Sequence, residues 1–232
     1  MLFVTVLLLI VCYGLAGYLG WLQRTPIYLF TIAAGHLSAL ASPLWRLLYS
    51  IQYSPSLSTV QTLLGQEVPL SLAWGAGWYY PLPALIVFYL YFIHWWFPGA
   101  LTGILTYLIF LLYHLLIETV GLRTETWGYE LMVLPLGLST PLLSAIMNGL
   151  VSYGLLYVLL AVWRSTWPSM LLAILPAALL LSLLIHGLLG APLWIALLLE
   201  GQPWALLAGL LSTIVLLVWA AQIITGGIKR LA

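Results

Sequence analysis

Residues 114–141 read HLLIETVGLRTETWGYELMVLPLGLSTP, and they decide how the chain is organised. A long apolar run ends here at Arg123, and Pro135, Gly137 and Pro141 interrupt the apolar residues that follow. Three of the five acidic residues and one of the six basic residues also fall in this stretch. Because polar groups are scarce in the rest of the chain, this stretch is where the sequence points to function.

The composition is that of a membrane protein. Of the 232 residues, 64% are hydrophobic and only 5% are charged, whereas soluble domains carry about 25% charged residues. Apolar runs of about 20 residues, the length that a helix needs to cross a bilayer, recur along the chain. We therefore expect an all-α fold, a polytopic transmembrane helical bundle in which residues 1–232 form a single integral-membrane domain.

The apolar runs predict about seven spans, at residues 2–22, 27–49, 69–96, 100–122, 140–163, 168–189 and 203–224. Pro81 and Pro83 are expected to bend the third span. The first lacks a basic leader region, so we expect a retained helix rather than a signal peptide. Residues 127–139 are apolar but too short to cross, which predicts an interfacial or re-entrant segment. Non-helical backbone at membrane depth must be buried in protein or line a cavity, which favours a pocket here.

Seven spans would place the two termini on opposite sides of the membrane. The side of the C-terminus would carry only basic residues, namely Arg24, Arg164, Lys229 and Arg230. The other side would carry Arg46, Arg123, Glu67, Glu125 and Glu200. The positive-inside rule then predicts that the N-terminus lies outside and the C-terminus in the cytoplasm. We expect the membrane to be a prokaryotic cell membrane. Tryptophans near the span ends, including Trp21, Trp45, Trp95, Trp167 and Trp204, predict an interfacial aromatic belt.

His114 and Glu118 lie four residues apart and so share one helix face. A carboxylate inside a membrane is costly unless it is paired or faces a polar cavity. One interpretation is that Glu118 pairs with His114 or Arg123 and locks two helices together. The other is that Glu118 is a catalytic acid in an apolar pocket and protonates a substrate that His114 helps to bind.

Glu130 is the second candidate acid, because apolar residues follow it directly. It stands beside Trp127 and Tyr129, whose ring faces would stabilise a carbocation formed by proton transfer. Aromatic residues at a membrane boundary are also the ordinary content of an interfacial belt. We count Trp127, Tyr129 and Asn148 as candidate substrate-binding residues, although hydrogen bonding between helices would equally explain Asn148.

The four histidines form a second constellation. His36 and His94 are expected toward the cytoplasmic side, and His114 and His186 toward the outer side. Each pair is a candidate for binding a haem iron, a metal or a chlorin pigment, while a packing role is the alternative. The composition also excludes other kinds of site. A single cysteine excludes a disulfide, and the absence of aspartate excludes Asp-rich magnesium sites. The net charge of +1 gives no electrostatic reason to expect a nucleic-acid partner.

The segment Glu118-x-x-Gly121-x-x-Thr124 resembles a signature of membrane carotenoid-synthesis proteins, the bacterioruberin-type C50 carotenoid hydratases. The residues from Trp127 to Tyr129, and those from Leu136 to Pro141, resemble the loop and helix entry that follow that signature. Glu125-Thr126 replaces the Gly-x-Pro-Phe-Gly loop of that family. The resemblance implies cofactor-free chemistry on a long polyene, in which an acid protonates a terminal double bond and water or an internal alkene captures the cation. It implies Glu118 as the first acid and Glu130 as the second.

Two functions are therefore expected. The first is to bind, and to modify by hydration or cyclisation, a carotenoid or other polyisoprenoid taken from the lipid bilayer, in a pocket between spans 100–122 and 140–163. The second is that of a non-catalytic accessory subunit of a larger respiratory or photosynthetic membrane complex, packed against other membrane subunits. In that case a haem or chlorin pigment would bind to the histidines, whereas the first function needs no cofactor.

Overall fold

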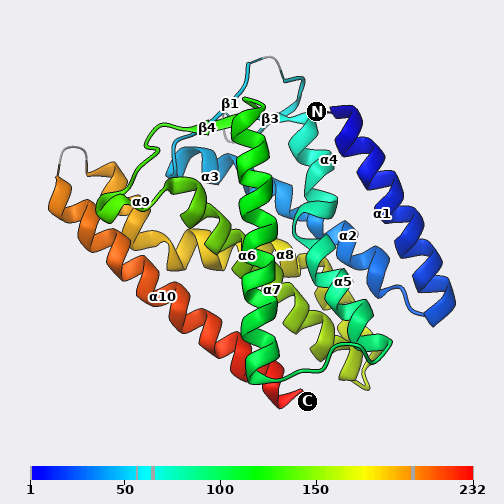
Figure 1. Cartoon of the computed structure of the whole chain (residues 1–232). Helices are drawn as coiled ribbons and strands as arrows, with labels where there is room; N and C mark the ends of the chain where they lie inside the picture. The colour runs from blue at the N-terminus through cyan, green and yellow to red at the C-terminus, as the bar shows by residue number, and fades with distance from the viewer. Residues whose placement is uncertain (1, 56, 64–65, 200–201, 232) are drawn as a thin grey trace.

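The computed structural model describes residues 2–55, 57–63, 66–199 and 202–231. It is a bundle of helices with a small cap of strands at one end, and the two termini lie at opposite ends of the bundle (Figure 1). Glu200, one of the charges used to predict the orientation, lies outside the described residues. The cap end carries Arg123, Glu125 and Glu130, and the end near the C-terminus carries Arg230.

The first half of the chain forms α1 (Leu2–Gln23), α2 (Ile27–Ser38), η1 (Ala39–Ala41), α3 (Ser42–Leu48), β1 (Ile51–Tyr53), β2 (Thr59–Leu63), β3 (Gln66–Pro69), α4 (Leu70–Tyr79) and α5 (Pro81–Phe92). The second half forms α6 (Ala100–Arg123), β4 (Trp127–Tyr129), η2 (Pro135–Gly137), α7 (Thr140–Arg164), η3 (Pro168–Ala173), α8 (Ile174–Ser182), η4 (Leu183–Leu189), α9 (Ala191–Leu198) and α10 (Pro203–Arg230).

Six helices in the described residues are long and apolar enough to cross a membrane. They are α1, the α2–η1–α3 unit, α6, α7, the η3–α8–η4 unit and α10. Their bounds follow six of the predicted spans closely, although α10 continues six residues beyond the expected end at residue 224. The expected all-α transmembrane bundle is therefore confirmed, and its apolar outer surface fits a lipid bilayer.

The remaining predicted span, the third along the chain at residues 69–96, is divided into two shorter helices, α4 and α5. Pro81 and Pro83 lie at the start of α5, and the first of them has no backbone N–H to continue the hydrogen-bond ladder of α4. At a rise of about 1.5 Å per residue, neither piece alone spans the roughly 30 Å apolar layer. α5 ends at Phe92 rather than at Trp96, and His94 in the turn that follows has a φ of 61°.

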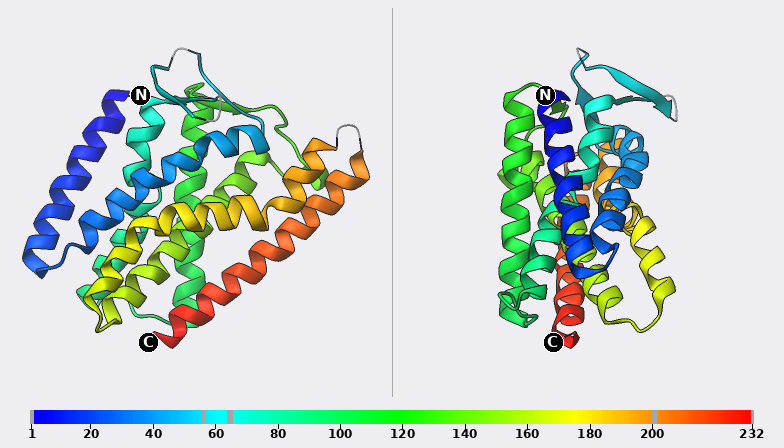
Figure 2. Two further views of the ribbon diagram at one scale, coloured as in Figure 1. Left: turned by 180° about the vertical axis from the view of Figure 1, so that it is seen from behind. Right: turned by 90° about the vertical axis from the view of Figure 1, so that its right-hand side faces the viewer.

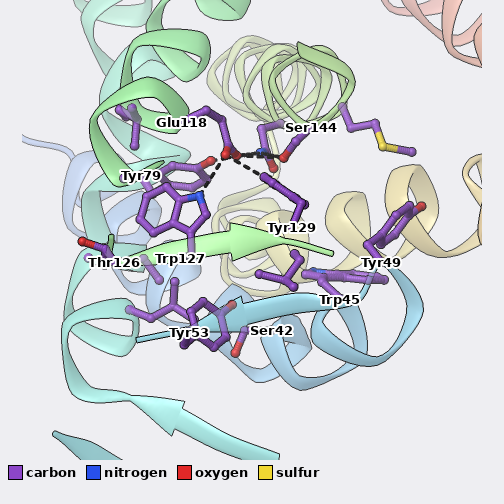
Figure 3. A pocket seen from close by; sticks show the side chains of 18 of the residues that line it. Ser42, Trp45, Tyr49, Tyr53, Tyr79, Glu118, Thr126, Trp127, Tyr129 and Ser144 are labelled. Atoms are coloured by element: carbon purple, nitrogen blue, oxygen red, sulfur yellow. Dashed lines mark hydrogen bonds between the residues drawn. The ribbon is translucent and has the colours of Figure 1, made fainter. Parts of the chain in front are cut away.

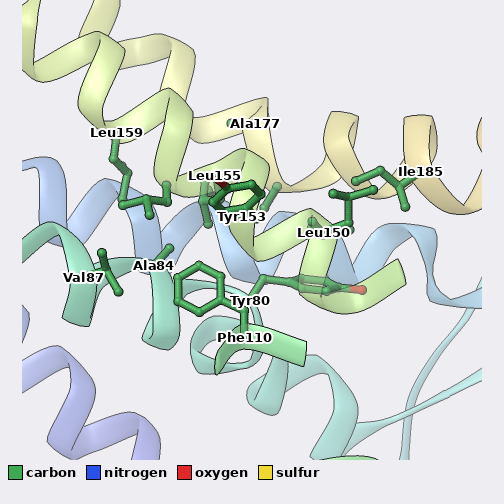
Figure 4. Close-up of a cluster of buried hydrophobic side chains, with 14 of the residues drawn as sticks. Tyr80, Ala84, Val87, Phe110, Leu150, Tyr153, Leu155, Leu159, Ala177 and Ile185 are labelled. Atoms are coloured by element: carbon green, nitrogen blue, oxygen red, sulfur yellow. The ribbon is translucent and has the colours of Figure 1, made fainter. Parts of the chain in front are cut away.

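α7 lies at the centre of the bundle. Of its most apolar 18-residue window, 78% is buried, compared with 17% for α1 and 22% for both α6 and α10. Figure 4 shows its side chains Leu150, Tyr153, Leu155 and Leu159 packed with Phe110 of α6 and with residues of α5, α8 and η4. A helix that is buried on nearly all sides needs partners for its polar residues within the protein.

The strands cap the end of the bundle that holds the N-terminus. β1 pairs antiparallel with β4, and β2 pairs antiparallel with β3 (Figure 2). The predicted interfacial or re-entrant segment is thus a strand of this cap, followed by a tight turn at η2. Leu136, at the tip of that turn, has 76% of its side chain exposed, and Val133 has 61%. An apolar tip of this kind suits the membrane interface and does not dip into the bundle.

The crossing of α2 with the α4–α5 unit predicts a strong effect of one added methyl group. A Cβ at Gly35 would collide with the carbonyl oxygen of Ala76 and come within 2.6 Å of Pro81 Cγ, whereas Gly14 of α1 has open space. We expect Gly35→Ala to lower stability in detergent by about 1–3 kcal/mol through overpacking. Gly14→Ala should leave it unchanged or raise it by about 0.5–1 kcal/mol. Thermal unfolding of both variants checks this, and equal midpoints would contradict it.

Candidate functional site

Two polar stripes face each other where α6 packs on α7. His114 and Glu118 on α6 are four residues apart, and Ser144, Asn148 and Ser152 on α7 repeat the same spacing. Glu118 is bonded to Ser144 at 2.8 Å, and His114 Nε2 is bonded to Ser152 Oγ at 2.8 Å. The helices run antiparallel, so the stripes match along their length. These contacts place the acid at a fixed depth in the bundle.

The Glu118 carboxylate is 3% exposed and accepts four hydrogen bonds (Figure 3). Oε2 accepts from Trp127 Nε1 and from the Tyr129 hydroxyl, both at 2.9 Å. Oε1 accepts from the Ser144 hydroxyl at 2.8 Å and from Asn148 Nδ2 at 3.4 Å. Pairing with His114 or Arg123, one of the two sequence interpretations, is not what the described residues show. Neutral donors from α7 and β4 satisfy the carboxylate instead.

Gly121 explains how the Trp127 indole reaches the carboxylate. A Cβ at this position would collide with the six-membered ring of Trp127. The indole therefore lies directly on the backbone of α6, one turn beyond Glu118, and its N–H meets Oε2. Glu118 and Gly121 are three residues apart, so the helix places the acceptor one turn from the bare backbone on which the Trp127 ring packs.

A tight turn at the end of α6 carries the chain back to the carboxylate. The Thr126 amide donates to the Gly121 carbonyl at 2.9 Å, and the Glu125 amide donates to the Leu122 carbonyl at 3.1 Å. This pattern is a Schellman motif, with Glu125 in the left-handed position at a φ of 51°. Thr124 and Thr126 share a hydroxyl hydrogen bond of 2.8 Å across the turn. The turn sends β4 toward β1 and aims Trp127 and Tyr129 inward.

The carboxylate stands in the wall of a cavity of about 1150 Å³. Most of the wall is apolar or aromatic, which is typical of sites for apolar ligands. Its aromatic and histidine side chains are Trp45, Tyr49, Tyr53, Trp78, Tyr79, Tyr80, Tyr113, Trp127, Tyr129 and His186. The expectation that Trp45 belongs to the interfacial belt was wrong, because this side chain is only 8% exposed and faces the cavity.

The cavity reaches the lipid-facing surface of the bundle. On one side it is lined by Leu116 and Val120 of α6, which are 64% and 43% exposed. Val4 and Leu8 of α1, which are 54% and 39% exposed, also line it. Toward the cap it is lined by Glu130, which is exposed. The cavity is thus bordered by apolar side chains of the outer surface on one side and by an exposed carboxylate at the cap end.

Two tyrosines of the cap keep their protons in this setting. Burial, and after it the negative charge of Glu118, raise the pKa of Tyr129 well above its usual range. The same two causes raise the pKa of Tyr53. Both phenols are therefore neutral hydrogen-bond donors at physiological pH. The Tyr129 hydroxyl is a permanent donor to the carboxylate.

The structure brings together most of the predicted acid site. Glu118, Trp127, Tyr129 and Asn148 are in one hydrogen-bonded group. His114 stands beside that group, fully buried, with its ring against Tyr79, Tyr80 and Tyr113. The second candidate acid, Glu130, lies apart at the exposed rim.

The structure does not bring together the first predicted histidine pair, His36 and His94. His36 shares a hydrogen bond of 3.1 Å with the carbonyl oxygen of Ala73 and packs on Gly77, whereas His94 follows the end of α5. α5 has twelve residues, about 18 Å at the rise of a helix, so the two are not brought together. No group of three or more histidine, cysteine or acidic side chains in the described part of the chain is arranged to hold a metal ion.

Sequence reasoning missed Ser144, Tyr79 and Tyr80. Tyr79 accepts from Asn148 at 2.9 Å, and Tyr80 donates to Asn148 Oδ1 at 3.0 Å. The serine had a signal, because Ser144, Asn148 and Ser152 repeat every four residues in an otherwise apolar span. The two tyrosines had none, since their partner Asn148 lies 68 and 69 positions away in the sequence.

Gly121→Ala should displace the Trp127 indole and break its hydrogen bond to Glu118. We expect a loss of about 1–3 kcal/mol in stability, because the added Cβ overpacks the contact and the carboxylate loses a donor. Gly128→Ala, one residue along from Trp127 in open space, is the matched control and should change little. Equilibrium unfolding of both variants is the measurement. A Gly121→Ala protein as stable as the control would show that the indole does not rest on α6.

Comparison with known proteins gives no family for this chain. No family model, no curated protein and no solved structure matches it.

Proposed function

We propose that the protein binds a long polyisoprenoid, such as a carotenoid, and that Glu118 transfers a proton to its terminal double bond. The observation that carries the proposal is a buried carboxylate, held by four neutral donors, in the wall of an aromatic cavity that reaches the lipid. Of the acidic side chains whose burial is described, Glu67, Glu125 and Glu130 are exposed and only Glu118 is enclosed.

The walls of the cavity support an uncharged, apolar substrate. No lysine or arginine of the described residues lines it, so a phosphate or carboxylate group would find no counter-ion there. A long hydrocarbon would lie in the cavity with its remaining length between the exposed side chains of α1 and α6, in contact with lipid. A substrate that partitions into the bilayer needs no soluble binding domain to deliver it.

The reaction begins with the protonated form of Glu118. Its O–H bond breaks, and the proton adds to the less substituted carbon of the terminal double bond, which leaves a tertiary carbocation and a Glu118 carboxylate. In hydration, water bonds to the cation and returns a proton to the carboxylate. In cyclisation, an internal alkene attacks the cation and the ring then loses a proton to the same carboxylate. Either way the acid is regenerated and no cofactor is consumed.

The donors around Glu118 suit both states of the carboxyl group. Trp127, Tyr129, Ser144 and Asn148 stabilise the carboxylate that remains after proton transfer. The hydroxyl of Ser144 can rotate to accept a hydrogen bond when the acid is protonated. Trp127, Tyr129 and Tyr79 line the same cavity, and the negative quadrupole of an aromatic ring face favours a cation. Acid and cation stabiliser are thus in one place.

The apolar outer surface does not distinguish the proposed function from that of an accessory subunit of a membrane complex. Exposed side chains such as Phe3, Leu101 and Val215 are what contact with lipid requires, and contact with other membrane subunits would require the same. The proposed function rests on the buried Glu118 carboxylate in the cavity wall, which packing among other subunits does not by itself require.

Glu118→Gln tests the acid. In a bacterial host that makes lycopene, we expect the wild-type protein to convert part of it to a hydrated or cyclised product. The variant should form that product more slowly by a factor of about 10² to 10⁴, the usual contribution of general acid catalysis. Pigments are extracted and separated by chromatography with mass detection, and protein amounts are matched by immunoblot. A variant with the wild-type pigment profile would remove Glu118 from the chemistry.

Glu130→Gln is the matched control, because it makes the same change in an exposed carboxylate at the rim of the cavity. We expect it to keep the wild-type rate, since Glu130 is solvated and lies outside the Glu118 hydrogen-bond group. A loss as large as that of Glu118→Gln would instead assign Glu130 as the acid that the sequence resemblance placed second.

A further inference from the structure

The cavity has a second polar end, at α3 and the π-helix η4. Ser42, Trp45 and Tyr49 lie at i, i+3 and i+7, which is one face of α3 and its last turn. All three line the cavity, and Figure 3 shows them apart from the hydrogen bonds of Glu118. His186 of η4 joins them, with its ring centroid 5.1 Å from that of Trp45. Tyr49 fixes the position of η4 by donating to the His186 carbonyl at 2.7 Å.

Polar atoms in this region are buried without partners. Ser42 Oγ makes no hydrogen bond, and its side chain is only 8% exposed. His186 is 6% exposed, and the backbone of Ser182, one turn earlier on the same helix, is the neighbour that its ring meets. Trp78 Nε1 and Tyr113 OH, on other walls of the same cavity, are also unpaired. Buried polar groups in native proteins nearly always have a partner, so these atoms point to a bound group.

The chemistry of that group follows from what the atoms can do. The Ser42 hydroxyl and the His186 imidazole can each donate or accept a hydrogen bond. A hydroxyl or a carbonyl oxygen would therefore match both of them. It is neutral, because the described lining residues include no lysine or arginine and do include Glu118 and Glu130. It sits against Trp45 and Tyr49, which suits the end of an apolar molecule.

We propose that Ser42 and His186, with Trp45 and Tyr49 as walls, bind the oxygen-bearing end group of an isoprenoid lipid, a hydroxyl or a ring carbonyl. The inference rests on the proposed function, because it assigns the ligand of the same cavity one end group in addition to its hydrocarbon chain. The π-helix supports it, since π turns inside α-helices are frequent at functional sites. It places one end of the ligand at η4 and lets the chain run toward Glu118.

The test compares three C40 probes with the same skeleton: β-carotene, which has no oxygen, β-cryptoxanthin, which has one hydroxyl, and echinenone, which has one ring carbonyl. The full chain is purified from a carotenoid-free host into lipid nanodiscs, and quenching of tryptophan fluorescence reports binding. We expect at least one oxygenated probe to bind about three- to tenfold more tightly than β-carotene, which is the effect of a hydrogen bond. The preferred probe distinguishes a hydroxyl from a carbonyl.

Ser42→Ala and His186→Phe should each reduce that preference, measured as the ratio of the affinities for the oxygenated probe and for β-carotene. Ser38→Ala is the matched control, because Ser38 also lines the cavity but its hydroxyl already donates to the Gly35 carbonyl at 2.6 Å. This control should keep the full preference. Thermal unfolding of each variant shows whether it folds. If His186→Phe does not fold, the binding preference of Ser42→Ala alone tests the proposed end-group site.

Three results would overturn the inference. If the wild-type protein binds the three probes equally, the end-group site is absent and water fills the end of the cavity at Ser42 and His186. The proposed binding of a hydrocarbon would still stand. If the preference survives in Ser42→Ala and His186→Phe, the oxygen binds elsewhere. If no probe binds, both this inference and the proposed polyisoprenoid function fail.

Discussion

The structure depends on the cost of holding one carboxylate inside an apolar bundle. Glu118 is shielded from water and has no cationic partner among the described residues, so the lone pairs that it presents must meet neutral donors. Two of its donors come from α7 and two from β4. Satisfying this single group fixes how α6 crosses α7 and where the chain goes after α6 ends.

Several local features follow from that constraint. The Schellman turn reverses the chain after α6, and Gly121 leaves room for the returning indole of Trp127. β4 then pairs with β1, and residues of both strands form part of the cavity wall beneath the cap. Each feature is unremarkable alone. Together they bring side chains that are nine to thirty residues from Glu118 in sequence onto its two oxygens.

The same arrangement gives the cavity two kinds of access. The lipid side is bordered by exposed aliphatic side chains of α1 and α6, and the cap side by Glu130. Under the proposed function, a hydrocarbon chain would approach the acid from the first side and water from the second, and the cation would form in the apolar, aromatic part between them.

The sequence by itself determined the membrane fold, because uncharged apolar runs of about 20 residues recur along it. It also selected Glu118, because a carboxylate in such a run is costly unless it is paired or faces a polar cavity. It also placed Trp127 and Tyr129 near that acid, through proximity along the chain. Only the tertiary structure decided the rest. Tyr79 and Tyr80, at the break between α4 and α5, meet Asn148 of α7, and the π-helix at His186 forms a wall of the cavity with α3. These contacts join residues about 70 to 140 positions apart, and local periodicity carries no information about which distant helices meet.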